Sequence, residues 1–551
     1  MKKFILYSFI VSLALSFTAC EDFLKEESYG EPTTEDLMKE PENMALLVGQ
    51  AYAELKWLHD HWGYWGLNTL TSDEARCPIR QPGGHWNDSG YWKSLNSMTW
   101  TYDGKAIEFV WDTCIEGANL CNQIRSQIAD YKEQVDPEQY ARFEAELLVL
   151  RSYYYYAMFD LFGRIPYAEE YTSDVTVQYP LIDAKDVWKK LVDCLEANVE
   201  YMPDANNPSK SQNYGRVTQG FAYGLLARLY LNAASYGVDD VAGAYDKCVE
   251  YCNKVINSNA YSIEDNFFTN FLVNNEISNE NILVIVENGN PSFDSRSWDK
   301  MSNKLRINLL TQHYAFNELY DLLEKPWNGF AASKKFLELY DEADRRGPCP
   351  ASMGSDVDFQ DVTKKYGWFL GPVKVDGKIA KDENGADVII KADFASQSGA
   401  TWNDGARLMK YETEIAPAVN QYMENDFVLF RYADVLYMKA EAILRGATNG
   451  NIAEVLGLKD FQQIRTRAGL NEYTAATLTL DEILDERGRE FAWENVRRRD
   501  LIRFEKYTGT AYMWDFKASG VEPHRKWFPI PKKHIDMHVN DDIPWAQNQG
   551  Y

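Results

Sequence analysis

The sequence of 551 residues contains little cysteine, an excess of acidic over basic residues and, after its first 19 residues, no long apolar run. Eight cysteines are too few to frame a chain of this length with disulfides. Lysine and arginine number 57 against 83 aspartates and glutamates, which gives a net charge of −26. Because this charge repels phosphate backbones and anionic headgroups, the composition argues against nucleic-acid binding. No later segment reaches the roughly 18 apolar residues that a membrane-spanning helix needs.

Aromatic residues, by contrast, are abundant. The chain has 16 tryptophans, 35 tyrosines and 26 phenylalanines, which together make up 14% of the sequence. The apolar fraction of 45% is ordinary for a chain that buries a core, so wholesale disorder is excluded. The length allows two to four domains, or one long helical repeat fold. The aromatic content indicates that the protein needs flat apolar surface.

The first 19 residues have the pattern of a secretory signal peptide. Lys2 and Lys3 precede a short apolar run, and small residues precede Cys20. The segment Phe17-Thr18-Ala19-Cys20 resembles the lipobox of bacterial lipoproteins, although leucine is more usual than phenylalanine at its first position. We therefore expect lipidation of Cys20, with palmitate or similar acyl chains, after removal of residues 1–19. The alternative is cleavage by ordinary signal peptidase, which would leave Cys20 an incidental thiol.

Residues 20–40 are acidic and polar and are expected to form a tether, with a helix starting at Thr33 or Thr34. Beyond the tether, apolar residues recur at helical spacing in several segments, some of them paired across short turns. The pattern predicts a mainly all-α, tetratricopeptide-like scaffold. Its helix pairs are expected mainly within residues 41–60, 105–260 and 425–505. The individual helices are expected at residues 144–162, 217–236, 241–256, 427–444, 452–467 and 480–504, and the last of these segments is expected to form one helix or two.

Residues from about 260 to 425 are predicted to form a loop-rich, variable region. Within it, the pair Asp376-Gly377 lies between two short β-like runs and predicts a β-hairpin. The predicted architecture is thus a helical half that carries a loop-rich half with short β-hairpins. Loops on a rigid scaffold are where binding function tends to lie.

Seven of the 16 tryptophans fall between residues 57 and 111. Trp57 and Trp111 lie on expected helices and are predicted to belong to the core. Other tryptophans of this segment, above all Trp86 and Trp92 and also Trp65, lie close to glycine, asparagine, aspartate and serine, where a core is hard to build. These three are candidate binding platforms.

Aromatic planes beside polar side chains suit carbohydrate. A sugar ring has an apolar C–H face that an aromatic plane can cover, and its rim of hydroxyls suits aspartate, asparagine and arginine. Each stacking contact contributes on the order of 1 kcal/mol beyond burial, so weak binding of roughly micromolar to millimolar affinity is expected. The alternative is that the aromatics only stabilise their loop. The candidate rim residues are Asp73, Arg80, Asn87 and Asp88.

The sequence offers no positive sign of catalysis. It has no G-x-S-x-G, no phosphate-binding glycine loop with lysine and no H-E-x-x-H. Interleaved acids and arginines within residues 482–499 indicate a solvated or ion-paired helix face. Cys248 and Cys252 have the spacing of metal ligands on a helix, but without partners they are expected to be buried apolar side chains. His59, His61, His534 and His538 are expected at the surface.

Several segments, taken together, resemble the RagB/SusD family of glycan-binding lipoproteins. The resemblance runs nearly from end to end of the chain. It rests on residues 20–24 after the signal, on AELLVLRSYYYYAMFDLFGRIPY (145–167), GRVTQGFAYGLLARLYLNAA (215–234), FVLFRYADVLYMKAEAI (427–443), QIRTRAGL (463–470), ILDERGREFAWENVRRRDLIRF (483–504), FPIP (528–531) and QNQGY (547–551).

The resemblance implies a right-handed superhelix of tetratricopeptide-like helix pairs over residues 41–551, with the variable half folded over it. It further implies a lipid-anchored protein on the outer face of the outer membrane. Members of the family pair with a SusC-like TonB-dependent transporter, capture oligosaccharide or polysaccharide and act as the lid of the barrel. The acidic residues after Cys20 resemble the surface-export signal of such lipoproteins. No catalysis is attributed to the family.

Family members often build the glycan site from an N-terminal aromatic loop and a mid-chain loop. These correspond here to residues 73–92, 296–298 and 327–330, which adds Trp298 and Trp327 as platforms and Arg296 and Asn328 as rim partners. Two alternatives stay open: a glycoside hydrolase, and a transporter lid that handles peptides or has no ligand of its own. No cofactor is expected, and although acidic loops could hold a calcium ion, no motif predicts one.

Overall fold

The computed structural model describes residues 41–81, 86–205, 207–287, 306–320, 325–348, 367–375, 377–414 and 424–551. The predicted lipidation site Cys20, the tether before residue 41, and the candidates Arg296 and Trp298 lie outside these residues. The boundaries proposed for the signal and the tether therefore stay predictions.

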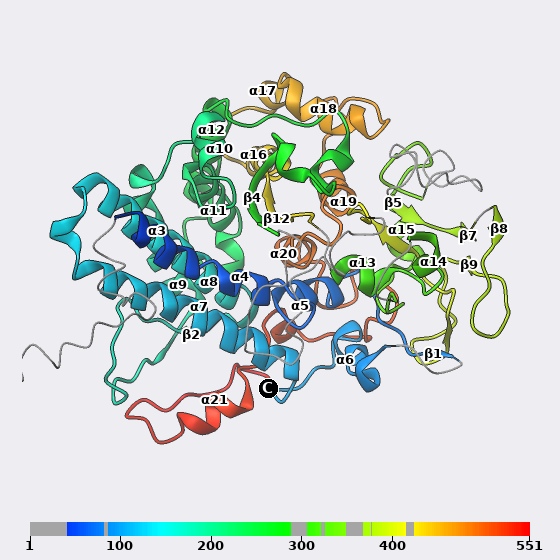
Figure 1. Cartoon of the computed structure of the whole chain (residues 1–551), viewed down its shortest axis with the longest axis horizontal. Helices are drawn as coiled ribbons and strands as arrows, with labels where there is room; N and C mark the ends of the chain where they lie inside the picture. Colours follow the sequence, from blue (N-terminus) through cyan, green and yellow to red (C-terminus); the bar gives the residue numbers. More distant parts are fainter. Residues whose placement is uncertain are drawn as a thin grey trace, which may run out of the picture.

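Long helices packed side by side form one half of the molecule, on the left in Figure 1. α7 packs against α8, α8 against α9, α11 against α12, and α12 against α16. This is the helix-pair architecture that the periodicity predicts. The helices of this half are α3 (Pro41–Gln50), α4 (Ala53–Leu58), α7 (Lys105–Ala129), α8 (Pro137–Phe162), α9 (Ala184–Asn198), α10 (Asn207–Gln212), α11 (Gln219–Leu231), α12 (Val241–Asn257) and α16 (Tyr432–Leu444).

Shorter helices and two-stranded sheets form the rest of the described chain, with β5, β7, β8 and β9 on the right in Figure 1. The predicted hairpin is confirmed, because β7 pairs with β8 across Gly377. The shorter helices are α5 (Tyr64–Leu70), α6 (Trp92–Asn96), α13 (Arg306–Thr311), α14 (Phe316–Tyr320), α15 (Lys334–Leu337), α17 (Ile452–Leu456), α18 (Lys459–Arg467), α19 (Leu480–Glu490), α20 (Arg497–Arg503) and α21 (Lys532–Met537).

Each described sheet has two strands, and only the β1–β10 pair is parallel. The pairs are β1 (Arg80–Gln81) with β10 (Ala400–Thr401), β2 (Ile165–Pro166) with β3 (Leu181–Ile182), β4 (Asn281–Ile285) with β12 (Phe427–Arg431), β5 (Gly367–Phe369) with β11 (Arg407–Met409), β6 (Gly371–Pro372) with β9 (Ile389–Ile390), and β7 (Lys374–Val375) with β8 (Lys378–Ile379).

Local signals in the sequence explain where α8 begins and ends. The Asp136 carboxylate accepts hydrogen bonds from the backbone N–H groups of Glu138 and Gln139, and Pro137 occupies the first helical position. Gly163 then ends the helix with a φ of 72°, a left-handed value that glycine adopts without strain. The predicted end of this helix at residue 162 is confirmed, but the helix begins at Pro137, seven residues before the predicted start at 144.

Residues 427–444 do not form the single helix that their spacing predicts. Residues 427–431 are strand β12, which pairs with β4 in the interior, and the helix starts only at Tyr432. Both strands are fully buried, so their apolar residues form a continuous run that periodicity alone cannot distinguish from a buried helix. The segment 480–504 forms two helices, α19 and α20.

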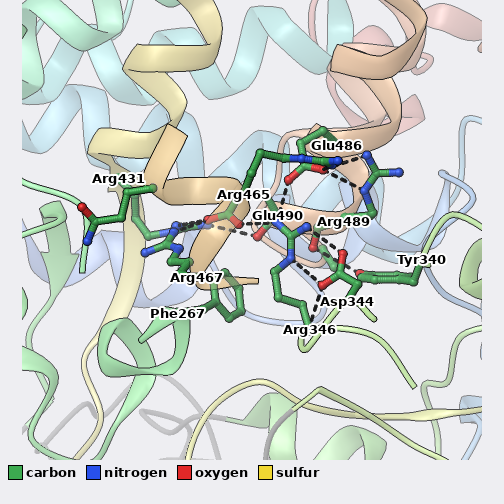
Figure 2. A network of polar contacts seen from close by, with 12 residues as sticks. Phe267, Tyr340, Asp344, Arg346, Arg431, Arg465, Arg467, Glu486, Arg489 and Glu490 are labelled. Atoms are coloured by element: carbon green, nitrogen blue, oxygen red, sulfur yellow. Dashed lines mark hydrogen bonds and ion pairs between the residues drawn. The ribbon is translucent and has the colours of Figure 1, made fainter. Parts of the chain in front are cut away.

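A buried network of ion pairs joins α18, α19 and β12 to the segment that carries Arg346 (Figure 2). The Glu490 carboxylate of α19 lies 2.6 Å from the Arg346 guanidinium, 2.8 Å from that of Arg431 and 2.7 Å from that of Arg467. Burial alone would raise the pKa of Glu490, but the three arginines outweigh it and hold the pKa well below its usual range. The expected ion-paired face is therefore present, but it lies in the interior and not in solvent.

The described part of the chain gives no sign of a membrane span or a metal site. None of its helices is both long and apolar enough to cross a bilayer. Its histidines, cysteines and acidic residues nowhere gather in a group of three or more that could hold a metal ion. Cys248 and Cys252 are buried in α12, as predicted, and neither forms a disulfide.

Candidate functional site

Four half-buried aromatic side chains gather at the N-terminal loops. We call Trp62, Trp86, Tyr91 and Trp327 the aromatic shelf. The ring centroids of Trp86 and Trp327 lie 5.2 Å apart, although the residues are 241 positions apart in sequence, and those of Trp62 and Tyr91 lie 5.3 Å apart. All four pack against the core and keep part of their surface exposed. The structure thus brings together two of the predicted platforms, Trp86 and Trp327.

A second layer of aromatic rings lies beneath the shelf. Trp92 and Phe330 are fully buried, and their ring centroids lie 5.8 Å from that of Trp86 in both cases. Trp92 also lies 4.6 Å from Trp62, so it connects the two ends of the shelf. Below Phe330, Trp65 stacks on the phenyl ring at 5.7 Å and is itself buried. Trp92 and Trp65 therefore support the shelf from inside and cannot serve as exposed platforms in this conformation.

His61 takes part in the same aromatic cluster. Its ring lies 5.4 Å from that of Trp86 and 5.8 Å from that of Trp327, and only 3% of the residue is exposed. His59 is buried as well, and burial lowers its pKa to about 3. The expectation that these two histidines lie at the surface is wrong, because aromatic neighbours enclose both rings.

The loop that carries Trp327 is held by backbone hydrogen bonds to α13. The N–H groups of Gly329 and Phe330 both donate to the Leu310 carbonyl, at 2.8 and 2.9 Å. Gly329 lies directly against the Trp86 indole, because a Cβ built on it would come within 2.6 Å of the ring. The close approach of backbone to indole thus requires glycine at this position.

Two buried arginines fix the other side of this loop. Arg80 donates to the carbonyl oxygens of Asn328 at 2.7 Å, Thr401 at 2.8 Å and Asp404 at 2.7 Å. Burial lowers the pKa of Arg80 to about 10. Arg407 donates to the side-chain oxygen of Asn328 at 2.7 Å, which helps to hold this asparagine at a φ of 53°.

These contacts correct the predicted rim of the site. Arg80 and Asn328 are 1% and 0% exposed, so they position the Trp327 loop and do not face solvent. Asp73 is also buried, where it forms a two-pronged ion pair with Arg497 at 2.9 and 2.8 Å and accepts a hydrogen bond from the Tyr512 hydroxyl. A charged or polar side chain among apolar neighbours needs such partners, which sequence spacing does not show.

Polar groups that remain at the shelf come from residues 87–89. The Asp88 carboxylate accepts a hydrogen bond from the Trp92 indole at 2.9 Å. Burial raises the pKa of Asp88, while His61 and the indoles of Trp92 and Trp86 act in the opposite direction. Asn87 is half-buried and accepts a hydrogen bond from the Gly90 N–H, and Ser89 is exposed. Of the predicted rim residues that the structure describes, Asn87 and Asp88 are therefore the two that lie beside the aromatic rings.

Sequence reasoning did not single out Trp62, His61, Tyr91 and Phe330 as parts of the site. Trp62 and Tyr91 belong to the aromatic-rich segment and could have been found from its density. Phe330 is adjacent to the predicted loop, but its role under Trp86 depends on a contact between distant segments. A partly exposed surface of aromatic planes with a carboxylate and amide beside it can cover apolar faces of a ligand and hydrogen-bond its hydroxyls.

Family comparisons identify the chain along most of its length. The model of the SusD family matches residues 294–551. A second model, described as "Starch-binding associating with outer membrane", matches residues 26–231. The chain belongs to the SusD family. The family resemblance stated from the sequence blocks is confirmed.

Individual SusD relatives agree with this assignment over long alignments. The starch-binding protein SusD of Bacteroides thetaiotaomicron is 25% identical over 492 residues, which cover 85% of this chain and 82% of the relative. The SusD-like protein P2 of Formosa agariphila is 23% identical over an alignment that spans 100% of both chains.

Solved structures of SusD-like proteins share the fold. Surface glycan-binding protein A from Bacteroides fluxus superposes with a TM-score of 0.69 at 21% identity and covers 93% of this chain and 99% of its own. The corresponding protein A from Bacteroides thetaiotaomicron, in complex with laminarihexaose, gives 0.69 at 22% identity and covers 92% and 99%. The predicted mainly helical fold is thus confirmed for this SusD-family chain.

Proposed function

We propose that this protein is a non-catalytic, lipid-anchored outer-membrane protein that captures oligosaccharide or polysaccharide on the aromatic shelf. The observation that carries the proposal is the cluster of four half-exposed rings, which a soluble protein would otherwise bury. Two relatives support it, because one is named a starch-binding protein and another is solved with a laminarin hexasaccharide. Trp86 and Trp327 are the central platforms, and Asn87 and Asp88 are the rim partners.

Calorimetry with a panel of polysaccharides tests the binding function. We expect Trp86→Ala and Trp327→Ala each to weaken binding at least tenfold, about 1.4 kcal/mol, without a large fall in melting temperature. The matched control is Trp57→Ala, because Trp57 is also half-buried but lies on α4 outside the shelf. Glycan binding that is unchanged by both shelf variants would contradict the proposal. A fall in melting temperature without any specific loss of binding would show that the rings serve only the core.

The alternative of a glycoside hydrolase has a direct test. A hydrolase needs two carboxylic groups roughly 5 to 10 Å apart at the bound sugar. Near the shelf, the described contacts place two carboxylic groups: Asp88 accepts a hydrogen bond from the Trp92 indole, and Asp60 lies 2.8 Å from a ring nitrogen of His61. Asp60 is only 9% exposed, which leaves it little access to a bound sugar. Incubation of the purified protein with each polysaccharide that it binds is expected to release no new reducing ends.

The protein is also proposed to act as the lid of a SusC-like TonB-dependent transporter. The segments around Gln178 and Asp542 lie side by side and are proposed to contact the transporter. The Asp542 N–H donates to the Gln178 side chain, and the Trp545 indole donates to the Tyr179 carbonyl. Large exposed apolar side chains on a folded surface favour such a contact. In these segments they are Tyr171, Val175, Val177, Met537, Val539 and Ile543.

Co-purification with a co-expressed SusC-like transporter tests the lid role. We expect the double variant Val175→Asp and Ile543→Asp to lose the complex while retaining glycan binding at the shelf. The matched control is Ile379→Asp, at an exposed residue of the β7–β8 hairpin, and it is expected to leave the complex intact. A complex that survives the double variant would exclude these segments as the docking surface.

A further inference from the structure

A cavity of about 720 Å³ lies in the helical half and shares no lining residue with the aromatic shelf. It is bounded by the turn after α8, the start of α9, the short helices η4 (Ala233–Tyr236) and η8 (Pro523–Lys526), and residues 548–550. Its volume is within the range of roughly 300 to 1000 Å³ that is typical of small-molecule sites. The size alone therefore allows a ligand of one or a few sugar rings.

One wall of the cavity is the half-buried indole of Trp527. The indole packs against Gly163, where an added Cβ would come within 2.9 Å of the ring. It also lies nearly parallel to Tyr236, at an interplanar angle of 17° and a centroid distance of 6.5 Å. The ring is thus held in place by the turn after α8 and by η4, and it offers an aromatic edge and face to the cavity.

The lining carries hydrogen-bond donors that no protein group uses. Among the described residues, the indole N–H of Trp527, the Lys526 ammonium, the Ser235 hydroxyl and the Gln549 amide make no side-chain hydrogen bond. The Lys526 ammonium lies 5.1 Å from the centroid of the Trp527 ring. Unused donors that converge on one space favour a ligand rich in acceptor oxygens.

The charge at the cavity is opposite in sign to that of the whole protein. Of the four charged side chains in the lining, three are cationic, Arg164, Lys185 and Lys526, and one is the acid Asp183. Asp183 lies 3.5 Å from Arg164, and Lys185 is paired with Asp239, so Lys526 is the cation of the lining that has no carboxylate partner among the described residues. Burial and the nearby Arg499 both lower the pKa of Lys526. An anion beside it would relieve the repulsion from Arg499.

We propose that this cavity binds an acidic sugar residue, with the carboxylate at Lys526 and Arg164 and the ring beside the Trp527 indole. The aromatic wall and the neutral donors Ser235 and Gln549 distinguish the site from one for a bare anion, which would need only charge. The site is separate from the shelf and does not depend on glycan binding there. It would let the protein hold a charged residue of a ligand at a second point.

Calorimetry on the purified full chain tests the proposal with three probes: glucuronic acid, glucose and inorganic phosphate. We expect glucuronic acid to bind at least tenfold more tightly than either glucose or phosphate. Lys526→Gln is expected to weaken glucuronic acid binding at least fivefold, and Arg164→Gln is expected to weaken it in the same direction. Because the Lys526 backbone carbonyl keeps its hydrogen bond from Arg498, the glutamine variant should fold normally.

The matched control is Lys210→Gln, since the Lys210 ammonium also lies 5.1 Å from an aromatic centroid, that of Tyr261, but far along the chain and outside the cavity. It should leave glucuronic acid binding unchanged, and so should the shelf variant Trp86→Ala, which distinguishes this proposal from the previous one. Equal affinity for glucose and glucuronic acid, or an undiminished affinity in a folded Lys526→Gln variant, would overturn the proposal. Phosphate that binds as tightly as glucuronic acid would likewise reduce the site to one for simple anions and overturn the sugar assignment.

Discussion

Gly329 and Trp86 approach each other so closely that the indole rests on bare backbone. A methyl group at position 329 would lie 2.6 Å from the ring, well inside van der Waals contact. The two residues are 243 positions apart, so this contact joins the N-terminal aromatic loop to the mid-chain loop. It helps to fix the position of the Trp86 indole over the buried rings of Phe330 and Trp92.

Gly329→Ala is expected to displace the Trp86 indole and weaken polysaccharide binding by roughly three- to tenfold, because the platform would shift while the rest of the chain stays in place. Overpacking at this buried position costs about 1 to 3 kcal/mol of stability. Calorimetry and thermal melting together measure the two effects. The control is Gly457→Ala, where the nearest atoms lie 3.4 Å from an added Cβ, and it should change neither quantity much. Full affinity in Gly329→Ala would show that the contact does not position the ring.

The Arg80 guanidinium is expected to act on the site only through the Trp327 loop. Arg80→Met would remove hydrogen bonds to three carbonyl groups. The Asp404 carbonyl keeps a hydrogen bond from Arg407 and the Thr401 carbonyl keeps one from the Asp404 N–H, but the buried Asn328 carbonyl loses the Arg80 donor, which costs about 1 to 3 kcal/mol. We expect a lower melting temperature and weaker glycan binding, with binding recovered in part at low temperature. Arg80→Lys should restore only part of the lost stability and binding, because one ammonium cannot reach the Asn328 carbonyl together with those of Thr401 and Asp404. If Arg80→Met lost binding without losing stability, Arg80 would contact the glycan directly.

How much of the site the sequence predicts depends on the range of the interaction. The density of tryptophan in residues 57–111 is a local property, and it led to Trp86. The burial of Asp73 against Arg497 depends on residues 424 positions apart, so an aspartate in a polar loop gave no sign of it. Arg80 and Asn328 were placed at the rim for the same reason. Their polar side chains are satisfied by distant carbonyls, which spacing along the chain does not reveal.

The same distinction holds for the fold. α8 could be predicted to its last residue, because its periodicity and the glycine that ends it are both local. Strand β12 could not, because its buried apolar run becomes a strand only by pairing with β4, which is more than 140 residues earlier. The acidic and basic residues of α19 predicted a solvated or ion-paired face, and its burial depends on arginines of other elements, which local spacing does not show.

Glu490→Gln is expected to destabilise the protein by about 3 to 5 kcal/mol, since it leaves three buried guanidinium groups facing a neutral amide. Urea unfolding measures the loss. The control is Asp193→Asn, which removes an exposed ion pair with Lys189, one helical turn earlier in the sequence. It should change the free energy of unfolding by less than about 0.5 kcal/mol. Equal effects of the two substitutions would mean that burial of the network contributes nothing to stability.

Lipidation of Cys20 is expected to anchor the protein, because multiple acyl chains on one residue hold a soluble domain at a membrane. Cells grown with labelled palmitate should incorporate the label into the wild-type protein and not into Cys20→Ser. The variant should move from the membrane fraction to the soluble fraction. Cys349→Ser, another cysteine outside the described residues, serves as the control and should keep the label. Label retained in Cys20→Ser would place the acyl chain on another residue, and a wild-type protein without label would indicate cleavage by ordinary signal peptidase.

Glu74 is a buried carboxyl group that follows α5 and contacts Trp493. Its side chain accepts a hydrogen bond from the Trp493 N–H at 2.9 Å, and only 1% of the residue is exposed. Burial raises its pKa from 4.5 to about 8, and the hydrogen bond from Trp493, which acts in the opposite direction, does not compensate. Glu74 is therefore protonated in the folded protein at neutral pH and ionised in the unfolded chain.

The folded state consequently binds one more proton than the unfolded state between pH 4.5 and about 8, so this group lowers the stability of the fold as the pH rises through that range. Glu486 has the opposite effect on stability at lower pH. Burial alone would raise its pKa, but Arg346, Arg489 and Arg465 lower the pKa to about 2. The stability that ionised Glu486 contributes to the fold is therefore lost as the pH falls from 4.5 to 2. Glu74→Gln keeps an acceptor for the Trp493 N–H and removes the titration. Urea unfolding should show the variant gaining stability over the wild type as the pH rises from 5 to 8, with little difference at pH 5. A constant difference between the two proteins across this range would mean that Glu74 ionises in the folded state as it does in water.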